Sequence, residues 1–157
     1  MTALRLRPSE SADDDALFDW MRDREAVALA AFTAADPYDR EAFDRWRARN
    51  LANPTIVDRM IDVDGVLVGT IYSWAVEGER EISYWIDREH WGRGYATAAL
   101  QAFLAERPDR PLYGQTAAHN GGSARVLERA GFVKIDTELG YANGVGAEIE
   151  CHTYRLD

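Results

Sequence analysis

The N-terminal part of the chain shows two kinds of hydrophobic pattern. Residues 4–8 alternate apolar and basic side chains, and this period of two predicts a short first strand. Residues 11–23 and 39–51 repeat apolar side chains at helical spacing, so each segment predicts an amphipathic helix. The linking segment 31–38 follows neither period and is expected to be a loop.

A three-stranded meander is predicted next. Residues 55–63 and 66–74 are rich in β-branched side chains, and the Asp64-Gly65 pair between them is a strong signal for a tight hairpin turn. After a short polar turn, residues 81–87 form the third strand. Strands connected in this way are antiparallel neighbours in one sheet.

The C-terminal half alternates helices and strands. An alanine-rich helix is predicted to follow the glycine-containing stretch 90–100 and to end near residue 107, before two prolines. A strand at 112–118, a helix at 120–132 and a strand pair at 133–139 and 148–156 complete the chain. The order β-α-α-β-β-β-α-β-α-β-β predicts a mixed α/β fold, with a central sheet of about six to seven strands and about four helices. Its one β-α-β crossover, from Glu81 to Thr116, is expected to join two parallel strands.

Composition and charge narrow the function. The 157 residues are consistent with one domain over residues 1–157, and the absence of a leader or membrane span in the sequence leads us to expect a cytoplasmic protein. The net charge of -9 argues against a general nucleic-acid binder and suits a cationic partner. Cys151 is the only cysteine, which excludes an internal disulfide, and no His/Cys spacing suggests a metal site.

The stretch HWGRGYATAAL, residues 90–100, carries the first candidate chemistry. The first amides of a helix lack intrahelical partners, and glycine lets an anion such as phosphate approach them closely. The spacing fits neither a Walker loop, which needs a Gly-Lys pair, nor a dinucleotide fingerprint, which needs a third glycine where Thr97 stands. These residues alone leave a phosphate site and a plain strand-to-helix turn equally open.

Two longer motifs favour the phosphate site. YWIDREHWGRGYAT at 84–97 and HNGGSARVLERAGF at 119–132 occur in the order and spacing of the GNAT acyl-CoA N-acyltransferases. The chain resembles the RimJ/RimL-like branch of that family over about residues 4–156. This resemblance implies a GNAT-like sheet whose parallel strand pair splays apart at the cofactor site. It also implies acetyl-CoA (coenzyme A) as acyl donor, no metal, and an amine as acceptor.

The resemblance assigns cofactor-binding residues as well. The main chain of the splayed strand would bind pantetheine, and the backbone of the glycine stretch would bind the pyrophosphate. The implied residues are Tyr84, Trp85, Ile86, Trp91, Gly92, Arg93, Gly94, Tyr95, Ala96, Thr97, Asn120 and Ser123. Two positions depart from the usual family pattern, because Trp91 replaces a glutamine or arginine and Leu127 replaces the tyrosine that often acts as general acid.

The catalytic residues implied by the family are a base and a proton donor. The acceptor amine must give up a proton when it attacks the thioester, and a carboxylate can take it. Glu81 is the expected base, and the weaker candidates are Glu79, Glu148 and His119. Ser123 or water would protonate the departing thiolate, and unaided departure is also open. Direct attack in a ternary complex is expected, because the lone cysteine lies late in the last strand.

The acceptor site in this family lies between the first two helices, the loop that joins them and the last strand pair. Its residues here are Phe32, Asp36, Tyr38, Trp46, Trp74, Tyr141 and Glu148. Acids beside aromatic rings suit a cationic amine. A peptide N-terminus, a polyamine, an aminoglycoside and an amino-acid-like metabolite all stay open, as do another acyl group and a homodimer. A module that binds acyl-CoA without catalysis is the alternative function.

Overall fold

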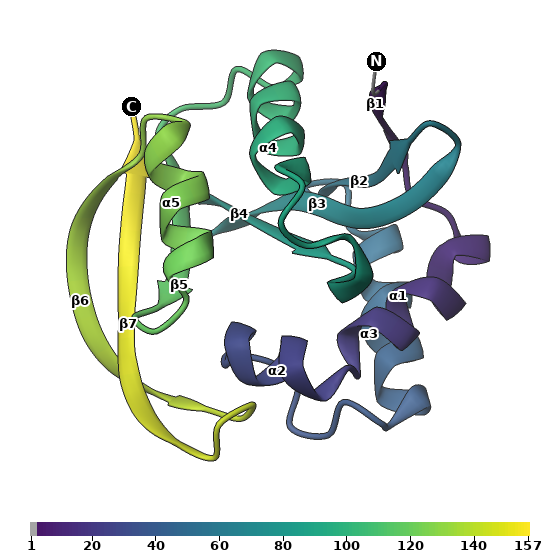
Figure 1. Ribbon diagram of the computed structural model, residues 1–157, viewed down its shortest axis with the longest axis horizontal. Coiled ribbons are helices and arrows are strands. Elements are labelled where there is room, and N and C mark those ends of the chain that lie inside the picture. Colours follow the sequence, from purple (N-terminus) through teal and green to yellow (C-terminus); the bar gives the residue numbers. More distant parts are fainter. Residues whose placement is uncertain (1–2) are drawn as a thin grey trace.

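A seven-stranded sheet with the order β1-β2-β3-β4-β5-β7-β6 runs through the computed structural model, which describes residues 3–157 (Figure 1). Its strands are β1 (Leu4–Pro8), β2 (Val57–Val63), β3 (Val66–Val76), β4 (Glu79–Ile86), β5 (Leu112–Ala117), β6 (Val133–Ala142) and β7 (Ala147–Leu156). β4 and β5 pair in parallel, and the other neighbours pair antiparallel. The predicted mixed α/β fold is confirmed.

Helices cover both faces of this sheet. They are η1 (Ser11–Asp13), α1 (Asp14–Met21), α2 (Arg24–Ala30), α3 (Arg40–Ala52), η2 (Arg88–His90), α4 (Tyr95–Glu106) and α5 (Gly121–Arg129). α4 and α5 pack on one face, where Leu100 and Leu127 join the main core. α3 lies on the other face, where Trp46 contacts Tyr72 of β3. Within residues 3–157, no helix combines the length and apolar character needed to cross a membrane.

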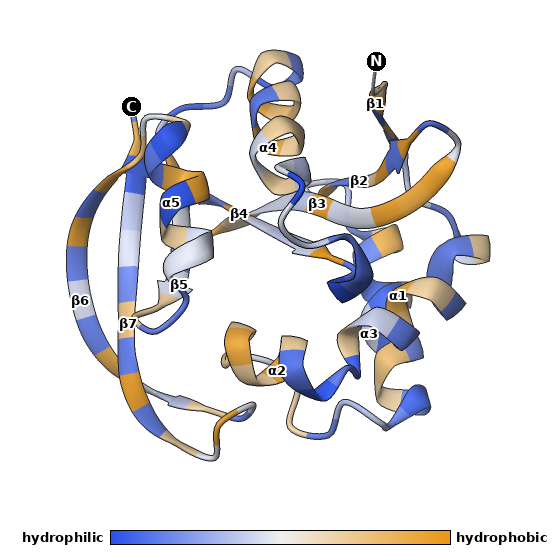
Figure 2. Ribbon diagram, viewed as in Figure 1, coloured by the Kyte–Doolittle hydropathy of each residue, from blue (hydrophilic) through white to orange (hydrophobic). Residues whose placement is uncertain are grey.

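The main core fills the space between the sheet and the helices α4 and α5. Its buried side chains include Ile71 and Ile82 from the central strands and Leu100 and Phe103 from α4. Figure 2 shows hydrophobic residues along both β3 and α4, which meet there. Because side chains alternate along a strand, this packing leaves the opposite face of β3 and β4 to other contacts.

The hydrophobic pattern does not predict the short helix α2. Its seven residues span fewer than two turns, so an amphipathic period does not stand out. Asp23 caps the helix by accepting a hydrogen bond from the Ala26 amide, and Ala26 and Val27 are buried. A capping side chain and tertiary burial therefore form α2, and the described residues contain one more α-helix than the sequence indicates.

The start of β4 also differs from the prediction. β4 begins at Glu79 rather than Glu81, because Glu77 and Gly78 alone make the turn after β3. Both turn residues have positive φ, 50° and 85°, as the favoured two-residue hairpin turns require. Glu81 therefore lies inside the strand, opposite Trp74 of β3, rather than at the strand's end.

The parallel strands β4 and β5 separate within the sheet, as the family resemblance implies. They pair only from Arg80 to Ile82 on β4, opposite Leu112 to Gly114 on β5. Beyond these residues β4 stays paired with β3 as far as Ile86, and β5 stays paired with β7. The two strands therefore diverge while each keeps its outer neighbour.

Candidate active site

Two cavities meet where β4 and β5 diverge. The larger, of about 650 Å³, is bordered by α1, α3, β3, β4, β5 and the segment after α2. The smaller, of about 380 Å³, is bordered by α2, β4, α4, α5 and the glycine loop, residues 91–97. Both are lined by Ala30, Tyr84, Trp85, Asn120 and Ser123. The two cavities therefore share a wall between β4 and the start of α5.

The glycine loop presents unpaired backbone amides to the smaller cavity. Gly92 and Gly94 have φ angles of 75° and 77°, and no atom lies within 4 Å of where a Cβ would stand on either residue. The first helical hydrogen bond of α4 runs from the Ala98 amide to the Gly94 carbonyl, at 3.0 Å. Among residues 3–157, the backbone amides from Gly92 through Thr97 have no protein acceptor. Unpaired amides at the positive end of a helix fit a phosphate group.

Cationic side chains reach this cavity from α5 rather than from the loop. Arg93 is exposed and lines neither cavity, so its position does not favour the predicted cofactor contact. Arg125 and Arg129 line the smaller cavity from one face of α5. Sequence reasoning missed both arginines. Their spacing of four residues, on a helix that begins beside a predicted cofactor residue, was the available signal.

Trp91 ties the glycine loop to the end of β4. Its indole Nε1 donates a hydrogen bond to the Ile86 carbonyl at 2.9 Å, and both residues line the smaller cavity. This carbonyl is one of the main-chain groups expected to contact the cofactor, and one of its two lone pairs is already occupied. The departure from the family pattern at Trp91 thus has a structural role.

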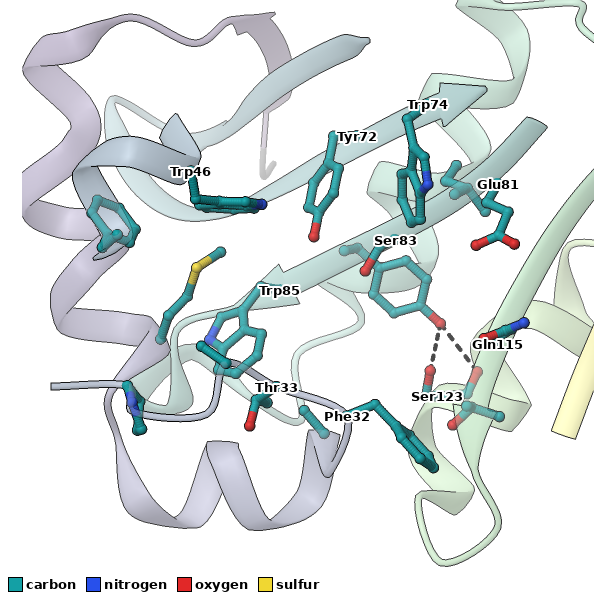
Figure 3. Close-up of a pocket in the computed structure, with 18 of the residues that line it drawn as sticks. Phe32, Thr33, Trp46, Tyr72, Trp74, Glu81, Ser83, Trp85, Gln115 and Ser123 are labelled. Carbon is teal, nitrogen blue, oxygen red and sulfur yellow. Dashed lines mark hydrogen bonds between the residues drawn. The ribbon is translucent and has the colours of Figure 1, made fainter. Parts of the chain in front are cut away.

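Two hydroxyl groups and an amide mark the junction of the cavities. The Asn120 side chain caps α5 by accepting a hydrogen bond from the Ser123 amide at 3.2 Å. The Tyr84 hydroxyl lies 2.9 Å from the Ser123 hydroxyl and 3.1 Å from the Ser123 carbonyl (Figure 3). Burial raises the pKa of Tyr84 to about 12. The sequence indicated only main-chain contacts for Tyr84, but its side chain reaches across to α5.

Glu81 is a half-buried carboxylate in the larger cavity. It lies on the face of β4 that also carries Ser83, beside Trp74 of β3 (Figure 3). Burial, and to a lesser degree the charge of Glu79, raise the pKa of Glu81. A carboxylate with a raised pKa is a better proton acceptor than an exposed one, which suits a general base.

A row of aromatic rings lines the larger cavity. Neighbouring rings from Phe18 through Phe43, Trp46 and Tyr72 to Trp74 have centroids 5.3, 5.8, 6.4 and 5.4 Å apart. Figure 3 shows the row from Trp46 to Trp74 leading toward the carboxylate of Glu81. The predicted acceptor residues Phe32, Asp36, Trp46 and Trp74 all line this cavity.

Several predicted residues lie outside both cavities. They are Tyr38, Tyr141 and Glu148 of the expected acceptor site and the weaker base candidates Glu79 and His119. Tyr141 and Glu148 are cross-strand partners and are exposed on the β6–β7 hairpin. The His119 ring contacts a main-chain carbonyl of α2, at 3.0 Å. The hairpin therefore contributes none of its predicted side chains to the larger cavity.

Cys151 is buried and lines neither cavity. Burial, with smaller contributions from Glu138 and Glu81, raises the pKa of its thiol, which keeps the thiol protonated and weakly nucleophilic. In the part of the chain that the structure describes, no three His, Cys, Asp or Glu side chains group as metal ligands would.

The two cavities, the diverging strands and the loop of free amides agree with a known family. The family model described as "Acetyltransferase (GNAT) domain" matches residues 3–133. The chain belongs to the GNAT acetyltransferase family. Acetyl transfer is the chemistry that this family and its fold support in general.

Solved GNAT structures share the fold over nearly the whole chain. Spermidine N-acetyltransferase from Vibrio cholerae, in complex with CoA and spermine, aligns with a TM-score of 0.84 and 16% identity, covering 98% of this chain and 94% of that one. Mycobacterium smegmatis RimJ, in complex with CoA-disulfide, aligns with a TM-score of 0.78 and 22% identity, covering 98% and 81%. An N-acetyltransferase from Staphylococcus aureus Mu50 aligns with a TM-score of 0.80 and 18% identity, covering 99% and 98%. No curated protein sequence matches the chain.

Proposed function

We propose that this chain transfers the acetyl group of acetyl-CoA to a primary amine, by direct attack while both substrates are bound. The observation that carries the proposal is the run of unpaired amides from Gly92 through Thr97, beside a cavity that shares lining residues with the cavity of Glu81. One cavity suits a phosphate-bearing donor and the other suits an amine. We take the whole chain to be one acetyltransferase domain of the RimJ/RimL-like branch.

The smaller cavity fits coenzyme A in charge and in hydrogen-bonding groups. The free loop amides would hold the diphosphate, and Arg125 and Arg129 would add positive charge beside it. The main chain of β4 near Tyr84 and Trp85 no longer pairs with β5, so it is open to pantetheine, as in strand addition. When bound, the donor supplies an acetyl group activated as a thioester.

Glu81 is the proposed general base. An amine attacks only in its neutral form, and its nitrogen must lose a proton as the amide forms. Glu81 takes this proton, directly or through a water molecule, and its raised pKa favours the transfer. Ser123, at the junction of the cavities, is the proposed donor to the leaving thiolate. The buried thiol of Cys151 supports direct attack over an acyl-enzyme.

The larger cavity favours a cationic amine with an extended body. Asp36 and Glu81 line it at separate places, and the aromatic row between α3 and β3 offers ring faces to a cation or an apolar chain. The V. cholerae neighbour's complex with spermine supports polyamines as one candidate, and a peptide N-terminus is another. Aminoglycosides and amino-acid-like amines complete the set to be compared.

Thiol release from acetyl-CoA tests the proposal. Purified protein is mixed with acetyl-CoA and, in turn, spermine, spermidine, an aminoglycoside, an amino acid and a short peptide with a free N-terminus. We expect amine-dependent thiol release with at least one class and formation of the matching amide by mass spectrometry. Binding of acetyl-CoA with no turnover on any amine would instead favour the non-catalytic sensor.

A pair of variants tests the role of Glu81. Glu81→Gln should lower kcat by about a hundredfold or more, the usual contribution of a general base, with coenzyme A affinity nearly unchanged. Glu148→Gln is the matched control, because this exposed carboxylate lines neither cavity. Equal rates in Glu81→Gln and the wild type would remove Glu81 from the mechanism.

A further inference from the structure

The contact between Tyr84 and Ser123 joins two elements that the diverging strands leave apart. Tyr84 lies on β4, where pairing with β5 has already stopped, and Ser123 lies in the first turn of α5. Their hydroxyl oxygens are 2.9 Å apart, and either one can be the donor (Figure 3). The Ser123 carbonyl, 3.1 Å from the phenol oxygen, is the other acceptor within reach of the phenol's single proton.

The position of this pair is unusual within the site. Five residues line both cavities, and Tyr84 and Ser123 are the two of them that carry hydroxyl groups. Asn120 is a third polar member, but its side-chain oxygen is already bound to the Ser123 amide. The hydroxyl pair therefore stands on the wall that the two cavities share.

The usual proton donor of the family has no counterpart at its own position. Leu127 stands there, with 1% of its surface exposed, and its side chain packs against Gly114 of β5. No hydroxyl can act from that place. In this chain a phenol from β4 lies beside the Ser123 hydroxyl instead, and both residues line the smaller cavity.

We propose that Tyr84 and Ser123 form a two-hydroxyl relay that delivers a proton to the departing thiolate. This inference rests on the proposed acetyl transfer. As the carbon–sulfur bond breaks, the Ser123 hydroxyl gives its proton to the sulfur, and Tyr84 gives its own proton to Ser123. The proton that Glu81 removes from the amine returns to Tyr84 through water in the shared larger cavity. The nitrogen thus loses one proton, the sulfur gains one, and both hydroxyls end as they began.

The surroundings of Tyr84 fit a donor. The high pKa that burial gives its phenol keeps the proton on the oxygen at neutral pH, so the resting pair is fully protonated. No carboxylate lines both cavities. Glu81, which lines the larger cavity, lies three positions before Tyr84 on β4, so the two side chains are on opposite faces of the strand. Tyr84 therefore gives Ser123 a proton source within hydrogen-bond distance.

The thiol of bound coenzyme A provides a test that needs no acceptor. A hydroxyl pair that donates to the sulfur stabilises the thiolate, so the pKa of the bound thiol should be low in the wild type. We expect it to rise by about one unit or more in Tyr84→Phe and in Ser123→Ala, as loss of a hydrogen bond to a charged group predicts. The measurement is ultraviolet titration of thiolate absorbance with saturating coenzyme A.

Tyr113→Phe is the control, because Tyr113 lies on β5 and lines neither cavity. It should leave the pKa of the bound thiol unchanged, and all three variants should keep coenzyme A affinity within about threefold. A wild-type pKa retained in Tyr84→Phe would overturn the relay. Failure of the wild type to bind coenzyme A would overturn the proposed function, and the relay with it.

Kinetics give a second, independent measurement. In a relay, the second hydroxyl is useless without the first, so the double variant should lose no more than either single one. We expect kcat to fall about ten- to a hundredfold in each of the three proteins, at the low end for acid catalysis, because a thiolate is a good leaving group. Losses that multiply in the double variant would show two independent roles and overturn the relay. A ring-fluorinated tyrosine at position 84 should have a higher kcat than Tyr84→Phe, because its more acidic phenol has the same shape as tyrosine and still carries a proton to donate.

Discussion

Gly94→Ala separates what the glycine loop does for folding from what it does for binding. Gly94 has a φ of 77°, in the left-handed region, and an added Cβ would meet no atom within 4 Å. The cost to the fold is thus the conformational strain of a non-glycine residue there, about 1–2 kcal/mol. Gly146, in the β6–β7 turn, has a φ of 78° and equally open surroundings. Gly146→Ala should therefore lower the free energy of unfolding by the same amount.

Binding should distinguish the two variants. Gly94 lines the smaller cavity, and the Cβ that Gly94→Ala adds would enter open space beside amides that have no protein partner. Holding a phosphate away from them removes at least one hydrogen bond to a charged group, about 1.5–3 kcal/mol, or roughly ten- to a hundredfold in Kd. The turn that contains Gly146 lines neither cavity, so Gly146→Ala should bind coenzyme A as the wild type does.

The two effects are measured separately. Urea unfolding gives the free energy of unfolding of each variant, and titration calorimetry gives the Kd for coenzyme A. We expect both variants to lose the same free energy of unfolding. Only Gly94→Ala should also lose affinity for coenzyme A. If Gly94→Ala bound coenzyme A as tightly as the wild type, the loop amides would not be the phosphate site. If Gly146→Ala weakened coenzyme A binding as much as Gly94→Ala, the loss of affinity would follow from the loss of stability and not from the glycine loop.

Three other substitutions address the base, the scaffold and the acceptor cavity. Glu79→Gln removes a charge that raises the pKa of Glu81, so the acidic limb of the kcat/KM profile should move to lower pH, although burial still holds that pKa up. Arg47→Met leaves the carboxylates of Asp14 on α1 and Asp58 on β2 without their buried partner. It should lower the free energy of unfolding by about 3 kcal/mol, measured in urea, whereas Arg40→Met, at an exposed ion pair, should change little. Trp46→Ala should raise KM for the amine about three- to thirtyfold while calorimetry finds an unchanged Kd for coenzyme A.

Much of the donor side of the site follows from the sequence, because it depends on residues close together in the chain. A glycine-containing turn before a helix leaves free amides whatever surrounds it, and Asn120 caps the helix that it begins. The positions of Gly92, Gly94 and Ser123 at a cavity wall agree with the motif. Arg93 shows the limit of this reasoning, since the same loop turns its side chain outward.

The acceptor side was harder to predict, because its residues come from distant segments. Tyr141 and Glu148 pair across the β6–β7 hairpin and are exposed, outside both cavities. The sequence pattern did not identify Tyr72 as a site residue. In the structure Tyr72 stands opposite Ser83 of β4, and its ring contacts Trp46 in the aromatic row. Short-range patterns contain no information on which strand faces which helix.

By itself, the sequence determined the order of the strands, the longer helices and the family, since hydrophobic period, turn residues and motif spacing are local properties. Only the tertiary structure decided where β4 and β5 part, how two cavities join there, and that the hydroxyl of Tyr84 meets Ser123. The physical reason is that a strand's pairing partner and a side chain's neighbours depend on contacts between segments far apart in the chain. The pattern of a strand fixes which side chains share a face, and packing fixes what that face meets.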